Sequence, residues 1–212
     1  MGRAEKIMAK IKFTKGELKR QRDSLKQFKR YLPTLQLKKQ QLQLEILQQN
    51  AFLQDKKSLL LKKQQAALTW AGLLEEAPRS LRAYLAITKV ITQQKNIAGV
   101  DIPVWEGLEF ASAEYDLFQE PLWLDLGIGS LKELLGLKQE ILILEQGVDI
   151  LRRELRVTTQ RVNLFEKVKI PAAEENIRLI KIYIGDQMAN AVGRSKIAKK
   201  KIENLLPQEV LV

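Results

Sequence analysis

Residues 14–53 read TKGELKRQRDSLKQFKRYLPTLQLKKQQLQLEILQQNAFL, and this stretch decides the fold class. An apolar residue returns at almost every seventh position, which is typical of the seam of a coiled coil. We therefore expect one long helix over residues 14–77, started by Thr14 and Glu17 as a capping box, bent at Pro33 and ended by Pro78. The seam consists of Leu18, Leu25, Leu32, Lys39, Ile46, Leu53, Leu60, Ala67 and Leu74.

A second stretch with the same period covers residues 130–206. One row contains Leu134, Ile141, Val148, Leu155 and Val162, and its companion row contains Leu137, Leu144, Leu151, Thr158 and Phe165. The next step of the companion row, from Phe165 to Ala173, takes eight residues instead of seven. The pattern therefore predicts a second long helix with a local departure from coiled-coil winding near Pro171.

A different texture separates the two helices. Residues 80–94 have the pattern of a short amphipathic helix. Residues 96–105 form a β-type run with Gly99 and Pro103, and the turn residues Glu106-Gly107 followed by residues 108–111 indicate a β-hairpin. The expected fold class is all-α dominated: a long antiparallel two-helix coiled coil with a small central module of a short helix plus a β-hairpin. The expected division is 1–77, 78–129 and 130–212, within one elongated domain.

The composition excludes several kinds of chemistry. The chain has no His and no Cys, so it has no Ser-His-Asp triad, cysteine nucleophile, disulfide or His/Cys zinc site. Gly127-Ile-Gly129 precedes a predicted helix, but Lys132 stands where a nucleotide-binding loop needs its third glycine. The longest apolar runs are far shorter than a bilayer span. We therefore expect no catalytic residue, no cofactor, no metal and no direct membrane insertion.

Charge is distributed unevenly along the chain. The formal net charge is +11, residues 1–39 carry 13 basic and three acidic residues, and residues 96–131 carry seven acids and no Lys or Arg. Antiparallel helices would bring the two basic ends of the chain to one tip. Partner-binding residues are therefore expected at that tip and, with the exposed Phe118 and Trp123, in the acidic module. They are Lys6, Lys10, Lys12, Lys15, Lys196, Lys199, Lys200 and Lys201 at the tip, and Trp105, Glu106 and Glu109 in the module.

Three short motifs carry a resemblance to a known family. They are Phe13-Thr-Lys-Gly-Glu-Leu18, Asn96-Ile-Ala-Gly-Val-x-Ile-Pro-Val104, and the late-helix residues Gln160-Arg-Val-Asn163, Glu166, Ile170-Pro171, Asn176-Ile177 and Ile180. Together with the two long helices, they resemble the D subunits of V-type and A-type rotary ATPases. Pro33, the glutamine-rich residues 40–49 and Trp123 depart from the family's usual pattern.

The resemblance implies a non-catalytic central rotor shaft. Such a shaft transmits torque between a hexamer of A and B subunits, which hydrolyses or synthesises ATP, and a membrane ring that moves protons or sodium. It also implies the F and C subunits (the latter called d in eukaryotes) as partners, and a cytoplasmic location peripheral to the membrane.

The residues alone leave two other functions open. The net charge of +11 suits a helical nucleic-acid-binding protein, and the seams suit a generic coiled-coil scaffold. Co-purification separates the three, because a shaft brings down large nucleotide-binding subunits, whereas a nucleic-acid-binding protein brings down nucleic acid that high salt removes. The resemblance favours the shaft, with no nucleic-acid partner.

Overall fold

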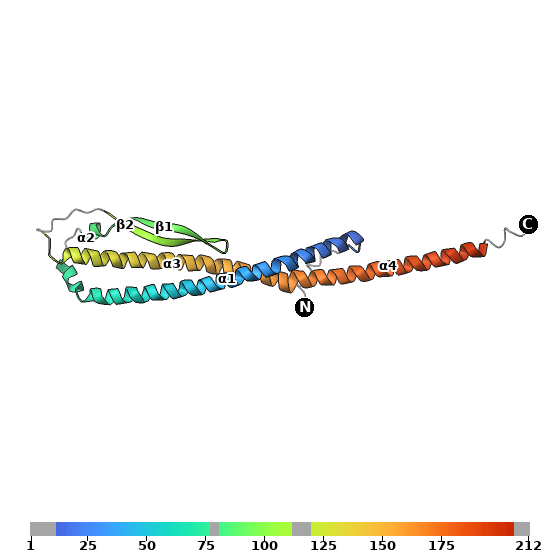
Figure 1. The fold of residues 1–212 in the computed structure, drawn as a ribbon, viewed down its shortest axis with the longest axis horizontal. Helices are drawn as coiled ribbons and strands as arrows, with labels where there is room; N and C mark the ends of the chain where they lie inside the picture. The colour runs from blue at the N-terminus through green and yellow to red at the C-terminus, as the bar shows by residue number, and fades with distance from the viewer. Residues whose placement is uncertain (1–11, 77–80, 112–119, 206–212) are drawn as a thin grey trace, which may run out of the picture. The chain divides into compact units, whose positions relative to one another are not determined.

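The computed structural model describes residues 12–76, 81–111 and 120–205, and the chain divides into two compact units. Unit 1 combines Met1–Gln36 with Gln160–Val212, and unit 2 is Leu37–Thr159. Each unit is described by itself below. In chain order the elements are α1 (Lys15–Leu68), the 3₁₀ helix η2 (Ala71–Glu76), α2 (Leu81–Tyr84), β1 (Ile87–Ile97), β2 (Val100–Phe110), α3 (Leu124–Leu164), the π-helical turn η3 (Phe165–Lys169) and α4 (Ile170–Leu205), as Figure 1 shows.

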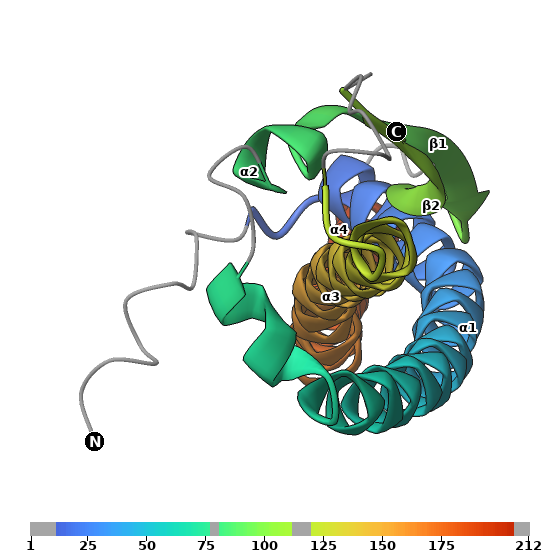
Figure 2. The same cartoon turned by 90° about the vertical axis from the view of Figure 1, so that its left-hand side faces the viewer.

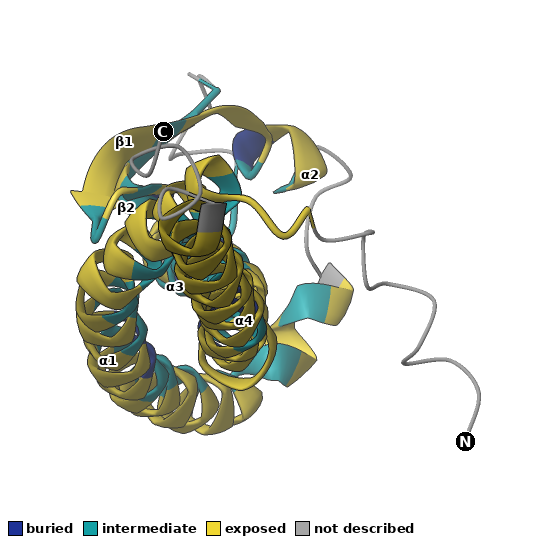
Figure 3. Cartoon of the chain, turned by 90° about the vertical axis from the view of Figure 1, so that its right-hand side faces the viewer, coloured by how far each residue is buried: buried dark blue, intermediate teal, exposed yellow. Residues whose placement is uncertain are grey.

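Within unit 2, α1 and α3 lie antiparallel. Lys38 contacts Glu154 at 2.9 Å, and Lys63 contacts Glu133 further along, so residue numbers rise on α1 as they fall on α3. Exposed residues cover the outer faces of the helices, and the few buried residues face inward (Figure 3). The predicted antiparallel helix pair is confirmed in this unit.

The main core of unit 2 lies where three elements meet. Leu42 and Ile46 of α1, Ile102 of β2 and Leu151 of α3 are all at most 9% exposed and form one cluster. Ala98, at the tip of the hairpin, packs against the same cluster. The hairpin is therefore anchored to both helices at one level of the pair.

The hairpin is two-stranded and antiparallel, with β2 as its inner strand (Figure 2). Ala98 and Gly99 form its turn with φ angles of 51° and 76°, the two positive values that the commonest two-residue hairpin turn requires. Asn96 supports the turn, because its Oδ1 accepts from the Gly99 N–H at 3.1 Å and its Nδ2 donates to Asp101 at 2.6 Å. β2 packs on α3, where the Pro103 carbonyl oxygen lies 3.7 Å from the Cβ position of Gly147.

The hairpin corrects two predictions. Residues 87–94 are strand rather than helix, since a run rich in β-branched residues can pair fully with β2. The turn lies at Ala98-Gly99, and Glu106 is instead the extra residue of a β-bulge, because Ile91 pairs with Gly107 and Thr92 with Trp105.

Within unit 1, α1 begins at the predicted cap. The Thr14 hydroxyl accepts from the Glu17 backbone N–H at 3.2 Å, while the Glu17 carboxylate accepts from Gln21 instead of reaching back to the cap. Phe13 contacts Tyr183, and Phe28 contacts Phe165, with ring centroids 5.0 and 5.4 Å apart. The pairing with α4 and η3 is therefore antiparallel here as well.

The π-helical turn η3 explains the irregular step in the second seam. A π-turn holds one residue more than an α-turn, so it takes up the eighth residue between Phe165 and Ala173 and keeps both rows on the side facing α1. Ala173, Ile177 and Ile180 are at most 8% exposed after it. The predicted departure near Pro171 is thus a π-turn that ends just before that proline.

Several predicted boundaries move. α1 ends at Leu68 rather than near residue 77, and α3 begins at Leu124, so Gly127 and Gly129 lie inside a helix rather than in a loop. A helical Gly127-Ile-Gly129 cannot form the loop that cradles a phosphate. α1 continues through Pro33 without interruption.

Replacing Gly99 by Ala should lower the free energy of unfolding by about 1–2 kcal/mol, because an L-residue pays that cost in a left-handed conformation. Urea unfolding followed by circular dichroism would measure it. The matched control is Gly136→Ala in α3, where a Cβ meets nothing within 4 Å and the helix should gain about 0.5–1 kcal/mol. Equal effects at the two positions would contradict the turn conformation.

Candidate partner-binding surfaces

The predicted basic tip is only partly within the described residues. Lys6 and Lys10 lie outside them. Phe13 and Lys15 line a pocket with residues of α4 from Tyr183 to Ala191, so the start of α1 lies beside that part of α4. Lys196 follows Ala191 by five residues, or about 8 Å of helix. The structure therefore places Lys12 and Lys15 beside an earlier part of α4 than the one that carries Lys196, Lys199, Lys200 and Lys201.

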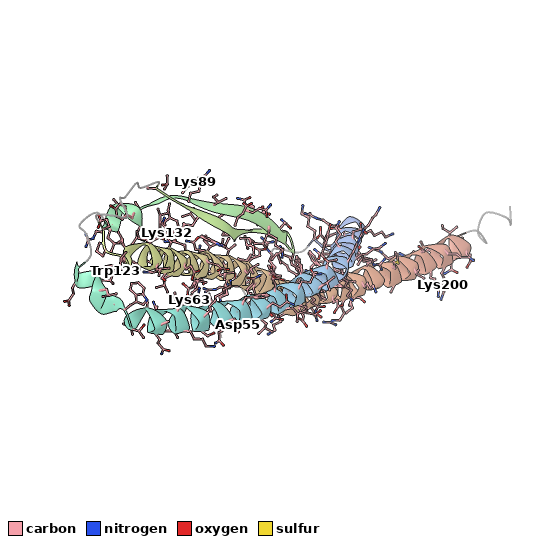
Figure 4. The ribbon with its side chains drawn as sticks, turned by 60° about the vertical axis from the view of Figure 1, so that its left-hand side comes forward. Asp55, Lys63, Lys89, Trp123, Lys132 and Lys200 are labelled. Atoms are coloured by element: carbon pink, nitrogen blue, oxygen red, sulfur yellow. The ribbon has the colours of Figure 1, made fainter. Side chains whose placement is uncertain are left out.

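The four α4 lysines are exposed. Lys199 lies 3.6 Å from Glu203 on its own helix, and Lys200 projects from α4 near its end (Figure 4). Ile197 and Ile202 lie next to these lysines in the sequence, and they are 60% and 58% exposed. This end of α4 is a basic surface with apolar side chains between the charges.

One ion pair of unit 1 has a resolved pKa effect. Arg178 donates to Glu175 from Nε at 2.8 Å and from Nη2 at 2.6 Å. This hydrogen bonding lowers the pKa of Glu175 and raises the pKa of Arg178. Both side chains are exposed, so the ion pair contributes little to the stability of α4.

In the hairpin, Glu106 and Glu109 are exposed and Trp105 is half-buried. The bulge at Glu106 turns its side chain out of the regular alternation, as bulges next to binding sites often do. Trp123 is also only partly exposed, which corrects the expectation of an open side chain, and Phe118 lies outside the described residues. Asp101 holds the turn through Asn96 and is not a free acid.

Ion pairs between the helices were not predicted from the sequence. Every such pair in the described residues places a lysine on α1 and a glutamate on its partner helix. The pairs are Lys29–Glu174 in unit 1, and Lys38–Glu154, Lys56–Glu140, Lys57–Glu145 and Lys63–Glu133 in unit 2. A signal was present, because Lys56 and Lys63 interrupt one apolar row at the seven-residue spacing that also separates Glu133 from Glu140.

A pocket at the closed end of unit 2 was also missed. It lies where the turn after α1 meets the start of α3, and its volume is about 240 Å³. Its lining is mainly apolar and includes two tryptophans, Trp70 and Trp123. We call it the corner pocket, defined by Trp70, Leu73, Trp123, Leu126, Gly127 and Ser130.

Two kinds of feature are absent from residues 12–76, 81–111 and 120–205. No cluster of three or more acidic side chains there could hold a metal ion. No helix in those ranges is long and apolar enough to cross a membrane.

The geometry defines a class of protein: long antiparallel helix pairs that carry a β-hairpin, with charged and apolar surfaces suited to other proteins. Known proteins place it more closely. Residues 17–200 match the family of ATP synthase D subunits. The D subunit of the V-type ATP synthase of Borreliella burgdorferi is 45% identical over 195 residues, which cover 92% of this chain and 96% of that protein. Its counterparts in Chlamydia muridarum and Chlamydia pneumoniae are 34% and 32% identical and cover 98% and 95% of their own lengths.

The chain therefore belongs to the family of ATP synthase D subunits, and it is a subunit of a V-type rotary ATPase complex. The three sequence motifs that suggested this family lie within or beside the matched residues.

Proposed function

We propose that this chain is the non-catalytic central rotor shaft of its ATPase. It transmits torque between the A/B hexamer, where ATP is hydrolysed or synthesised, and the ion-translocating ring of the membrane part. The observation that carries the proposal is the antiparallel pairing of α1 with α3 and α4, found in both units of a chain that belongs to the family of ATP synthase D subunits. The chain itself supplies no catalytic residue, cofactor or metal ligand in this proposal.

Transmission of torque requires two helices that cannot slide past each other. Apolar rows such as Val148 and Leu151 bury the contact, and the ion pairs fix its register, because a shift along the helices would separate each lysine from its glutamate. Exposed ion pairs add little stability but discriminate between registers. Pairing of this kind suits a stiff shaft better than a flexible tether.

The partner contacts follow from charge. We propose that the basic residues Lys6, Lys10, Lys12, Lys15, Lys196, Lys199, Lys200 and Lys201 face the A/B hexamer. Trp105, Glu106 and Glu109, on the hairpin of unit 2, face the F or the C subunit. In this arrangement the chain lies on the cytoplasmic side and touches the membrane part only through its partners.

Direct observation of rotation tests the proposal. The chain has no Cys, so Gln93→Cys on the exposed strand β1 provides a single site for a gold bead in the complex immobilised through its A subunits. With ATP, the bead should turn in one direction in steps of one third of a turn, since a ring of alternating A and B subunits has threefold symmetry. A control bead on one of the A subunits should stay fixed. A bead on this chain that stays still while ATP is hydrolysed would contradict the shaft.

A further inference from the structure

The outer strand of the hairpin has an unpaired edge. Among the described residues the sheet contains only β1 and β2, so the side of β1 away from β2 has no neighbouring strand. β1 is 11 residues long, about twice the usual length, contains no Gly or Pro, and is exposed along almost its whole length (Figure 3). An edge of this kind pairs readily with a further strand, because its backbone N–H and C=O groups face water.

The turn of the hairpin determines which backbone groups point outward. Ile97 and Val100 close the two-residue turn at Ala98-Gly99 as a hydrogen-bonded pair, and hydrogen-bonded and non-bonded pairs alternate from there along the ladder. Gln93 and Lys95 therefore direct their backbone groups to β2, whereas the residues between them and beside them direct theirs to the open edge. These outward residues are Thr92, Gln94 and Asn96.

Two observations agree with this assignment. Pro103, which has no N–H, is the ladder partner of Gln94, and at such a position the backbone groups of both strands point away from each other. Within residues 12–76, 81–111 and 120–205, no backbone or side-chain group bonds to the outward backbone groups of β1. The edge therefore offers three consecutive outward residues to an additional strand.

The charge on β1 has one sign. Lys89 and Lys95 are its only charged residues, both are exposed, and Lys89 projects from the hairpin away from the helices (Figure 4). Neither lysine forms an ion pair with any described residue, although Glu109 is the ladder partner of Lys89. A strand that pairs with this edge therefore gains by carrying acids.

The same lysines disfavour a second copy of this chain at the edge. Two β1 strands that paired antiparallel over their full length would meet at Thr92, the central residue. Each Lys89 would then stand directly opposite a Lys95, at both ends of the contact. Like charges directly opposite each other destabilise a strand pair. The edge is thus closed to its own copy and open to an acidic strand.

We propose that the edge of β1 takes up an extended segment of another subunit as a third strand of the sheet. The backbone of the segment bonds to the outward residues Thr92, Gln94 and Asn96, and Asp or Glu side chains six positions apart lie opposite Lys89 and Lys95. A paired strand holds its partner fixed to the chain, so the subunit turns with it. This last step rests on the proposed function.

Hydrogen exchange of single amides, resolved by fragmentation mass spectrometry, compares the isolated full chain with the assembled ATPase complex. The amides of Thr92 and Gln94 should exchange rapidly in the isolated chain and at least about a hundredfold more slowly in the complex, because they acquire carbonyl acceptors there. The amides of Gln93 and Lys95, which bond to β2, should be slow in both and serve as the internal control.

Charge reversal tests the acidic character of the segment. Lys89→Glu combined with Lys95→Glu should speed exchange of the Thr92 and Gln94 amides in the complex at least about tenfold, and more at low salt than at high salt. The matched control reverses two other exposed lysines, Lys62 and Lys138, which form no ion pair with any described residue. Lys62→Glu combined with Lys138→Glu should leave the protection of β1 unchanged.

The outcomes separate the added strand from the shaft. If the Thr92 and Gln94 amides exchange equally fast in the isolated chain and in a complex whose bead turns, the added strand is wrong and the shaft stands. Protection that the reversal of Lys89 and Lys95 leaves intact would contradict an acidic segment. Protection that rises with the concentration of the isolated chain would assign the edge to a second copy and overturn the proposal. A still bead, in a complex that protects these amides, would contradict the shaft and leave the added strand in place.

Discussion

Leu42→Ala should lower the free energy of unfolding by about 2–5 kcal/mol, one of the two largest effects expected in this chain. Leu42 is fully buried where α1, β2 and α3 meet, so its truncation leaves a cavity that none of the three elements can close alone. Urea unfolding of the isolated chain, followed by circular dichroism at constant ionic strength, measures the loss.

The control for this prediction lies two residues away. Leu44 is on the same helix but 62% exposed, so Leu44→Ala should cost less than about 0.5 kcal/mol. The same substitution then separates burial from helix propensity. Similar losses for the two variants would mean that the core of unit 2 is not where Leu42, Ile102 and Leu151 place it.

The second large effect is the difference between two single-residue deletions, one in the π-helical turn η3 and one in α3. Deleting Val168, which is 54% exposed, should convert the π-turn to an α-turn and change the free energy of unfolding by less than about 1 kcal/mol. The apolar rows then keep a seven-residue step across the former turn. Circular dichroism and urea unfolding of the deletion variant test this directly.

An equal deletion elsewhere should be far more harmful. Removal of Gln146, an exposed residue of α3, turns the helix after it by about 100° and swings Val148, Leu151 and Val162 off their buried face. Each such side chain contributes about 1.5–3 kcal/mol when buried, so the loss should exceed about 3 kcal/mol. If the two deletions cost the same, η3 is not an inserted residue.

Much of the fold could be predicted, because the seven-residue spacing of apolar residues can be read within a single segment of the sequence. The heptads starting at Leu18 and Leu134 required two long helices, and the eight-residue step at Phe165 located η3 without showing its form. Strand β1 was missed, because Ile87, Val90 and Ile91 fit a helical face as well as a strand. Only pairing with β2, which is a tertiary effect, decides between the two.

The candidate sites were harder to predict. Charge density marked the basic residues, but it could not show that Lys15 lies beside the part of α4 before Lys196. The corner pocket was invisible, because Trp70 and Gly127 are far apart in sequence and meet only through the fold. Gly127, inside a helical pattern, does not indicate in the sequence that the Trp123 ring packs against it.

The one-way arrangement of lysine on α1 and glutamate on its partner helix has a consequence for synthesis. α1 contains 13 Lys and Arg against four Asp and Glu, and it leaves the ribosome well before Glu133 or Glu174. If two newly synthesised α1 helices on neighbouring ribosomes met, lysines would face lysines along the contact. Repulsion between these like charges would oppose their association. The same lysines attract the paired glutamates of α3 and α4 as soon as these helices emerge from the ribosome. We therefore expect a newly made chain to pair its own helices rather than those of a neighbouring chain.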